Sequence, residues 1–148
     1  MEIIKWDSSL EGPVPAFNDE HKYLIKVIND TYNLMREGKR DEAKKYLVEK
    51  VVSYTDKHFR HEEEVLEKYG FPKDKLEGHK KMHRFFVKHI VDELVPKIEK
   101  GGEAEFRDAL NFIVSWLIMH IKNMDVNGYG KWFKENNIPI PEDKMVDI

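Results

Sequence analysis

Residues 58–86 read HFRHEEEVLEKYGFPKDKLEGHKKMHRFF, and this stretch decides the fold. Its first part carries apolar residues at helical spacing up to Tyr69. Gly70 and Pro72 follow, and residues of these two types commonly end a helix. A second run with helical spacing starts at about Asp74. The stretch therefore predicts two consecutive helices joined by a short turn, an arrangement that favours antiparallel neighbours.

The same periodicity, followed along the whole chain, predicts four helices. Their approximate ranges are residues 19–37, residues 41–69, residue 74 to a kink or end at Pro96, and residues 103–123. No stretch alternates polar and apolar residues as a β-strand would, and the connections are short. We therefore expect an all-α protein, an up-down-up-down antiparallel four-helix bundle with an N-terminal arm and a short C-terminal tail that contains Pro139 and Pro141.

Length and composition limit the classes of function. A chain of 148 residues fits one domain with a sizeable core. Its net charge of -3 argues against a nucleic-acid partner or an anionic membrane surface, and the absence of Cys excludes thiolate metal ligands. The first residues lack the charged and apolar regions of a signal peptide, and no run of about 18 apolar residues occurs. We expect a single domain over residues 1–148, located in the cytoplasm.

Polar side chains interrupt the apolar helix faces at six places, and a seventh polar residue stands just beyond the end of the fourth helix. The six are His21, His58, Glu62, His79, His83 and His120, and the seventh is Asp125. His58 and Glu62 are four residues apart, and so are His79 and His83. The members of each pair differ by about 40° around the helix, so both can face inward. The other two histidines, His61 and His89, fit no ligand position, and we expect both at the surface or the rim.

Helix direction predicts that these polar residues meet. His21 lies early in the first helix, His58 late in the second, His79 early in the third and His120 late in the fourth. In an up-down-up-down bundle all four positions fall at the same end. Any one of them alone is more simply a hydrogen-bonded core residue, but burying seven polar groups together without partners would be costly. The pattern therefore predicts a buried site for two metal ions.

Counting donor atoms leaves one coordination position open. Five imidazoles supply five bonds and two bridging carboxylates supply four, whereas two octahedral ions need about twelve. One bridging hydroxide adds two, which leaves one position for a small external ligand. Imidazole-rich coordination suits iron, copper, zinc or nickel, and the spacing does not choose among them.

Four strings of this sequence resemble the hemerythrin family, specifically its single-domain bacterial type, the bacteriohemerythrins. The strings are HFRHEE at 58–63, YGFP at 69–72, HKKMHRFF at 79–86 and WLIMHIKNMD at 116–125. The resemblance extends from Trp6 to about Tyr129. It implies a non-haem di-iron centre that binds dioxygen reversibly, in an oxygen carrier, storage or delivery protein and not an enzyme. It also implies two iron ions per chain (Fe2+/Fe3+) with a bridging oxo or hydroxo group.

Carried over position by position, the resemblance implies specific metal ligands. One iron would take His79, His83 and His120, the other would take His21 and His58 and hold the open position, and Glu62 and Asp125 would bridge the two. Candidate walls of the ligand pocket are Leu24, Ile25, Phe59 and Trp116. This chain has Glu20 where the family often has Gln before the first ligand, which leaves the support of His21 open. It also has Gly128 where the family usually has Tyr, and Tyr129 follows.

Three other functions stay open at this point. A di-iron oxidase or peroxidase would activate dioxygen, although such bundles use Glu-x-x-His pairs and no histidine here has Glu three residues before it. A zinc hydrolase is weaker, because the chain has no His-Glu-x-x-His motif. An oxygen- or iron-sensing module would need a partner protein. The sequence identifies no protein partner, although oxygen delivery would involve an oxygen-requiring enzyme as recipient.

Overall fold

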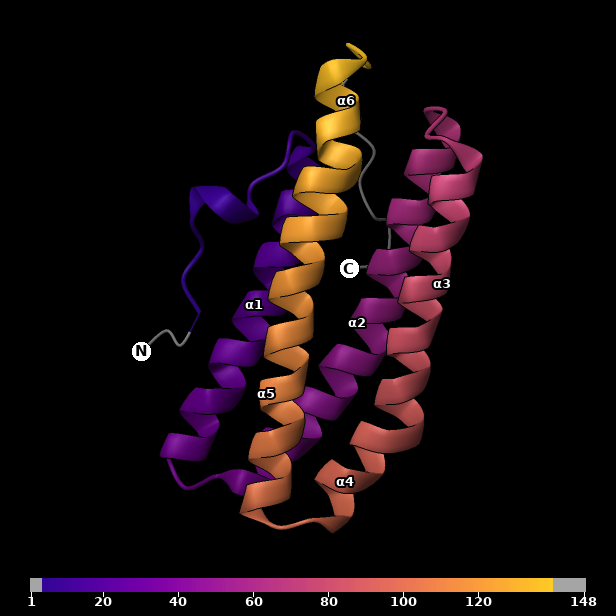
Figure 1. The fold of residues 1–148 in the computed structure, drawn as a ribbon. Helices are drawn as coiled ribbons and strands as arrows, with labels where there is room; N and C mark the ends of the chain where they lie inside the picture. The colour runs from indigo at the N-terminus through magenta and orange to yellow at the C-terminus, as the bar shows by residue number, and fades with distance from the viewer. Residues whose placement is uncertain (1–3, 140–148) are drawn as a thin grey trace.

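The computed structural model describes residues 4–139, and every regular element in that range is helical. The α-helices are α1 (Pro15–Arg36), α2 (Arg40–Lys68), α3 (Lys73–His89), α4 (Val95–Lys100), α5 (Glu103–His120) and α6 (Lys131–Glu135). They form four long rods that alternate in direction, because α4 continues α3 and α6 continues α5 (Figure 1). The predicted all-α four-helix bundle is confirmed. The predicted tail from residue 140 onward lies outside the described residues.

Glycine ends the second helix as the sequence predicted. Gly70 has φ +86°, a left-handed conformation that costs little without a side chain. The Phe71 N–H then donates to the Leu66 carbonyl at 3.0 Å, and Pro72 prevents the helix from continuing. Gly38, with φ +77°, ends α1 in the same way. Both turns are short, and the helices that they join lie side by side.

The third rod bends where Pro96 was expected to kink or end it. A π-helical turn, Ile90–Leu94, joins α3 to α4, and Pro96 stands in the first turn of α4. Proline has no N–H to donate, and its ring clashes with the preceding turn, so a widened turn relieves the conflict. In Figure 1, α4 leaves the axis of α3 and crosses toward the start of α5.

The fourth rod is longer than the sequence predicted. The expected end at residue 123 is wrong, because the π-helical segment Ile121–Gly130 carries α5 on into α6. In a π-helix the backbone hydrogen bonds join residues five apart, so His120 and Asp125 come onto the same face. In an α-helix residues five apart would differ by about 140° and would point apart.

Gly130 does not end the rod but allows close packing. A Cβ at this position would lie 3.0 Å from the carbonyl oxygen of Asp125 and 3.0 Å from Cδ of Pro13. Both contacts are closer than a side chain normally tolerates. Gly130 therefore serves the contact between the rod and the N-terminal arm.

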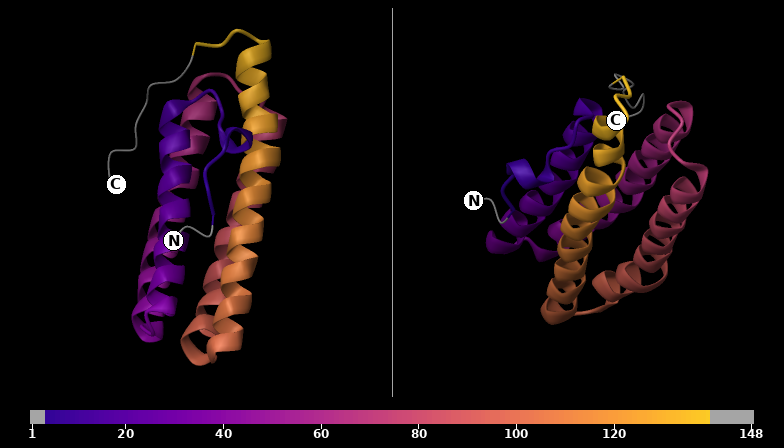
Figure 2. Two further views of the ribbon diagram at one scale, coloured as in Figure 1. Left: turned by 90° about the vertical axis from the view of Figure 1, so that its left-hand side faces the viewer. Right: turned by 45° about the horizontal axis from the view of Figure 1, so that its top comes forward.

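Two asparagines of α1 hold the predicted N-terminal arm on the bundle. Asn18 accepts from the Gly12 N–H and donates to the Gly12 carbonyl, both at 2.9 Å. Asn29 makes the same pair of bonds with Ile4, also at 2.9 Å. Figure 2 shows the arm running beside α1 and α5. The arm thus covers the rod that carries Asp125.

The core consists of two apolar clusters, one in the body of the bundle and one at the end where α1 begins and α2 ends. The larger cluster includes Leu24, Val51, Phe59, Phe86, Leu110 and Leu117. The smaller one is Val14, Phe17, Val65, Leu66, Phe71, Leu76, Tyr129 and Phe133. Along every rod the predicted metal ligands fall between members of the two clusters, so a polar layer is enclosed by apolar layers. No helix within residues 4–139 has the length and apolarity to cross a membrane.

Candidate metal centre

The structure brings all seven predicted ligand residues together in the enclosed layer. Each is buried, and the most exposed of them, His120, shows 4% of its surface. Their donor atoms form two groups, within each of which all atoms lie within 4.8 Å of one another. One group is Glu62, His79, His83 and His120, and the other is His21, His58, Glu62 and Asp125. The imidazoles thus fall into a group of three and a group of two, the division that the family resemblance implies, and the assignment of these residues as ligands stays a prediction.

Glu62 lies between the two groups. Its Oε1 is 2.6 Å from Nε2 of His79 and 3.4 Å from Nε2 of His83. Its Oε2 is 3.4 Å from Nε2 of His58 and 3.8 Å from Nε2 of His21. Each carboxylate oxygen thus faces a different group of imidazoles, which is what a carboxylate that bridges two ions requires.

Asp125 has the same arrangement. Its Oδ1 is 3.5 Å from Nε2 of both His79 and His120, and its Oδ2 is 3.0 Å from Nε2 of His21. Among the described residues, neither oxygen of Asp125 and neither ring nitrogen of His21 has a hydrogen-bond partner. Buried polar atoms without partners are costly. A metal ion satisfies imidazole nitrogens and carboxylate oxygens together, so the donor set fits a pair of ions such as iron.

The pKa values of the two carboxylates are shifted in opposite directions. Burial, together with the charge of Glu62, raises the pKa of Asp125 well above its usual range. Burial also disfavours ionisation of Glu62, but the imidazoles around it outweigh that effect and hold its pKa well below the usual range. His83 is buried as well, yet its bonds to Glu62 and Glu63 raise its pKa. Both shifts favour the protonated forms of Asp125 and His83, and a metal ion competes with those protons.

Metal binding is therefore expected to release protons and to strengthen as pH rises. Acidification adds protons to Asp125 and His83, which compete with the ion for the same atoms. The check is to measure the heat of ferrous-ion binding anaerobically, in two buffers of equal pH but different ionisation enthalpy. We expect the heats to differ by an amount that reports proton release, and the apparent affinity to fall on acidification. Equal heats and a pH-independent affinity would contradict the assigned protonation.

Glu20 holds two histidines in position. Its carboxylate is 2% exposed and accepts from Nδ1 of His58 at 2.7 Å and from Nδ1 of His61 at 2.9 Å. A carboxylate whose pKa is lowered only accepts, so both imidazoles carry their proton on Nδ1. Nε2 of His58 is then free to bind a metal ion. Glu20, which stands where the family often has Gln, thus supports His58. The sequence had left open whether this residue supports His21.

The prediction that His61 lies at the surface or rim is wrong. His61 is buried at 9% exposure, with its ring edge-on to Phe17 at 5.7 Å between centroids. Its direction, about 60° from His58 on the helix, turns it toward α1, where Glu20 receives it. His89 does lie away from the site, beside Phe112 at 4.7 Å between centroids.

Two further polar residues contact the ligands and were not predicted to do so. Glu63 accepts from Nδ1 of His83 at 2.8 Å, which again leaves Nε2 of that ring for a metal ion. The Tyr129 O–H donates to Oε2 of Glu62 at 3.2 Å. The displaced tyrosine still reaches the site because the π-helical segment changes the direction of residues after His120.

Aromatic rings cover the ligands on the side of the larger apolar cluster. Phe59 stacks on His83 at 3.8 Å between centroids, and Trp116 stacks on His120 at 4.5 Å. Leu24 and Ile25 are buried in the same cluster. These four residues are the predicted pocket walls; two of them touch ligands directly, and their role as walls remains a prediction.

Comparison with known proteins places the chain among metal-binding relatives. The family profile described as the hemerythrin HHE cation binding domain matches residues 12–129. A bacteriohemerythrin of Pseudomonas aeruginosa is 28% identical over 145 residues, which cover 97% of this chain and 90% of the relative. A bacteriohemerythrin of Clostridium acetobutylicum is 27% identical, covering 81% and 94%. A myohemerythrin of Theromyzon tessulatum is 28% identical, covering 88% and 94%.

Proposed function

The chain belongs to the hemerythrin family, whose members bind dioxygen at non-haem iron, and from that premise we propose that this protein is a reversible dioxygen carrier with a di-iron centre. Its task would be oxygen storage, or transport to an oxygen-requiring enzyme. We further propose that residues 1–148 act as one domain. The cytoplasmic location remains a prediction of the sequence.

The observation that supports this proposal best is the position of the two carboxylates. Glu62 and Asp125 each direct one oxygen toward the three-imidazole group and the other oxygen toward the two-imidazole group. A single ion would not need two carboxylates in this arrangement, whereas a pair of ions would use both as bridges.

We assign the ligands accordingly. His79, His83 and His120 would hold one iron, His21 and His58 would hold the other, and Glu62 with Asp125 would bridge them. The group with two imidazoles offers one donor fewer, so the open position belongs there. When bound, two ferrous ions would supply the electrons that dioxygen binding needs.

The protein's own residues would keep the reaction reversible. The apolar clusters on both sides of the ligand layer exclude water, and water or nearby acids would promote irreversible oxidation. Glu20 and Glu63 accept from the outward nitrogens of His58 and His83, which fixes the orientation of both rings. The Tyr129 hydroxyl holds a proton beside Glu62. Its pKa is raised well above the usual range by burial, so it stays protonated at neutral pH.

The balance of donors favours a carrier over an oxidase or peroxidase. Di-iron oxidases of the ferritin type surround their metals with carboxylates. Only two carboxylates of this site reach both groups of imidazoles, and the next two, Glu20 and Glu63, are occupied by histidine N–H groups. Five imidazoles and two carboxylates remain as candidate ligands.

Oxygen binding to the reduced, iron-loaded protein is expected to be reversible. Adding dioxygen should produce a charge-transfer band in the visible spectrum, and removing the gas should erase it over several cycles before oxidation accumulates. The check is absorption spectroscopy through repeated cycles of oxygen and argon. Decay of the band within one cycle, with catalytic consumption of a reductant or an organic substrate, would instead support the oxidase or peroxidase.

A further inference from the structure

A groove of about 620 Å³ opens at the metal-centre end between the start of α3 and the rod formed by α5 and α6. This volume is typical of sites for small organic ligands. His79, one of the proposed iron ligands, forms part of its wall. The ring is otherwise buried, at 2% exposure, so the groove gives a molecule bound in it contact with the edge of a metal ligand.

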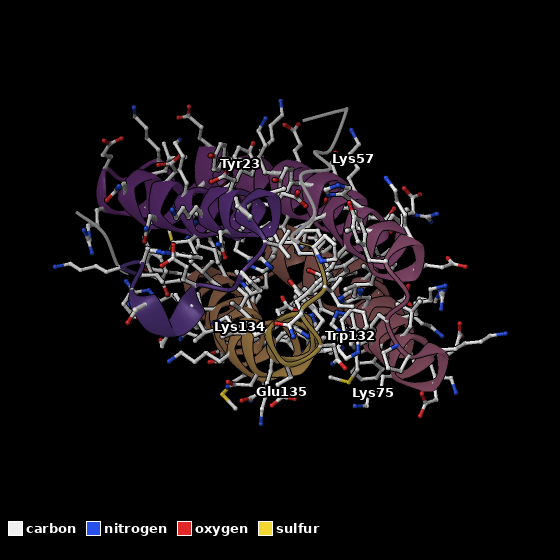
Figure 3. The ribbon with its side chains drawn as sticks, turned by 90° about the horizontal axis from the view of Figure 1, so that it is seen from above. Tyr23, Lys57, Lys75, Trp132, Lys134 and Glu135 are labelled. Carbon is white, nitrogen blue, oxygen red and sulfur yellow. The ribbon has the colours of Figure 1, made fainter. Side chains whose placement is uncertain are left out.

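The lining of the groove favours a planar aromatic anion. Phe71 and Trp132 supply an aromatic surface and lie edge to face at 5.2 Å between centroids. Lys75 and Lys131 line the groove with one acid, Glu135, which lies 3.6 Å from Lys131 and offsets its charge. Lys75 therefore supplies the net positive charge. Figure 3 looks down on this end of the molecule and shows Lys75, Trp132 and Glu135 on the same side. Aromatic and cationic groups thus meet in one place.

A second groove that reaches the metal centre lacks this selectivity. It lies between α2 and α3, has a volume of about 510 Å³ and includes His83 in its wall. Three acids and three bases line it, namely Asp56, Glu63, Asp92, Arg60, Arg84 and Lys88. Charges of both signs cancel there, so no single charge of ligand is preferred.

Glycine keeps the first groove open. Gly78 is exposed on α3 among the lining residues, and a Cβ built there would meet nothing within 4 Å. Glycine within a helix costs about 1 kcal/mol relative to alanine. A larger residue would therefore fill the groove without a steric penalty to the fold.

We propose that this groove binds a planar aromatic anion of the flavin mononucleotide type, whose reduced form returns electrons to the metal centre through His79. The inference rests on the proposed function, since a carrier that oxidises must be reduced before it binds dioxygen again. The reduced flavin gives up two electrons and two protons. One electron converts each of two ferric ions to the ferrous form, and the protons pass to water.

Binding is tested first, with oxidised flavin mononucleotide and ferric, iron-loaded protein, by the change in flavin fluorescence. We expect saturable binding that Gly78→Leu and Lys75→Glu each weaken about tenfold or more, a change of about 1.4 kcal/mol. Lys134→Glu, the same charge change at an exposed position of α6 outside the groove, is the matched control and should change affinity less than about twofold. Riboflavin, which lacks the phosphate, should bind more weakly than the nucleotide. Absence of binding, or equal binding by Gly78→Leu, overturns the proposal.

Electron transfer is tested second, by anaerobic mixing of ferric protein with increasing concentrations of reduced flavin mononucleotide. The reduction rate should saturate with concentration, and it should fall in Gly78→Leu and Lys75→Glu but not in Lys134→Glu. A rate that rises linearly and is equal in all variants overturns the donor role. The flavin-binding measurement does not depend on dioxygen binding. A protein that binds the flavin but not dioxygen would therefore refute the proposed function and leave the flavin site standing.

Discussion

His79→Ala and His120→Ala are expected to lose most of the bound iron, whereas His89→Ala is expected to keep it. Each of the first two removes an imidazole from the three-imidazole group and leaves a buried gap in the coordination. His89 lies away from the site, where its loss touches no ligand. The measurement is iron per chain after iron-replete expression, with circular dichroism to show that each variant is helical. The unaltered protein should hold two irons per chain.

His61→Ala is the informative intermediate case. The sequence alone predicts no effect, because His61 fits no ligand position. The structure predicts a weaker iron affinity, since His61 shares the Glu20 carboxylate with His58, and loss of such a supporting group typically costs about 10–100-fold in metal affinity. Iron loss as complete as in His79→Ala would show that His61 is itself a ligand, and the ligand assignment would then be wrong.

The arrangement of the site could be predicted because it follows from the order of elements. Chain direction reverses at each short turn, so ligands early in one helix and late in the next fall at one end of the bundle. Helical spacing then decides which members of each pair face inward. Both arguments use only local sequence, and the gathering of the five histidines and Glu62 agrees with them.

The end of the fourth rod could not be predicted from local sequence. Glycines such as Gly128 and Gly130 often end a helix, but here the chain continues through π-helical turns into α6. This π-helical segment places Asp125 on the same face as His120. The arm contact at Gly130 is a tertiary effect, which overrides local preference. The same is true of Glu20 and Glu63, whose partners lie on neighbouring helices. A glutamate in an acidic run gives no sign on its own helix that a histidine of the next helix will donate to it.

Removing the iron is expected to lower the melting temperature by about 10–20 °C. Each ion that binds only the folded state adds about 2.7 kcal/mol at a free concentration a hundredfold above its dissociation constant. For a domain of this size each kcal/mol raises the melting temperature by about 2–4 °C. Chelation also leaves the carboxylate oxygens of Asp125 and the ring nitrogens of His21 buried without a hydrogen bond among the described residues, which adds to the loss. Differential scanning calorimetry before chelation, after chelation and after iron is restored measures the effect.

The loss of protection should be confined to one end of the bundle, because an apolar cluster that contains no metal ligand packs the other end. Leu47, Ile98 and Phe106 are at most 1% exposed there, and they pack in the larger apolar cluster without any ligand residue among them. Amide hydrogen exchange in metal-free protein should therefore speed most around His58, His79 and His120 and change little around those three apolar residues. Equal protection along all helices with and without iron would mean that the polar layer is stable without metal. The claim that its buried polar side chains need a metal ion would then be wrong.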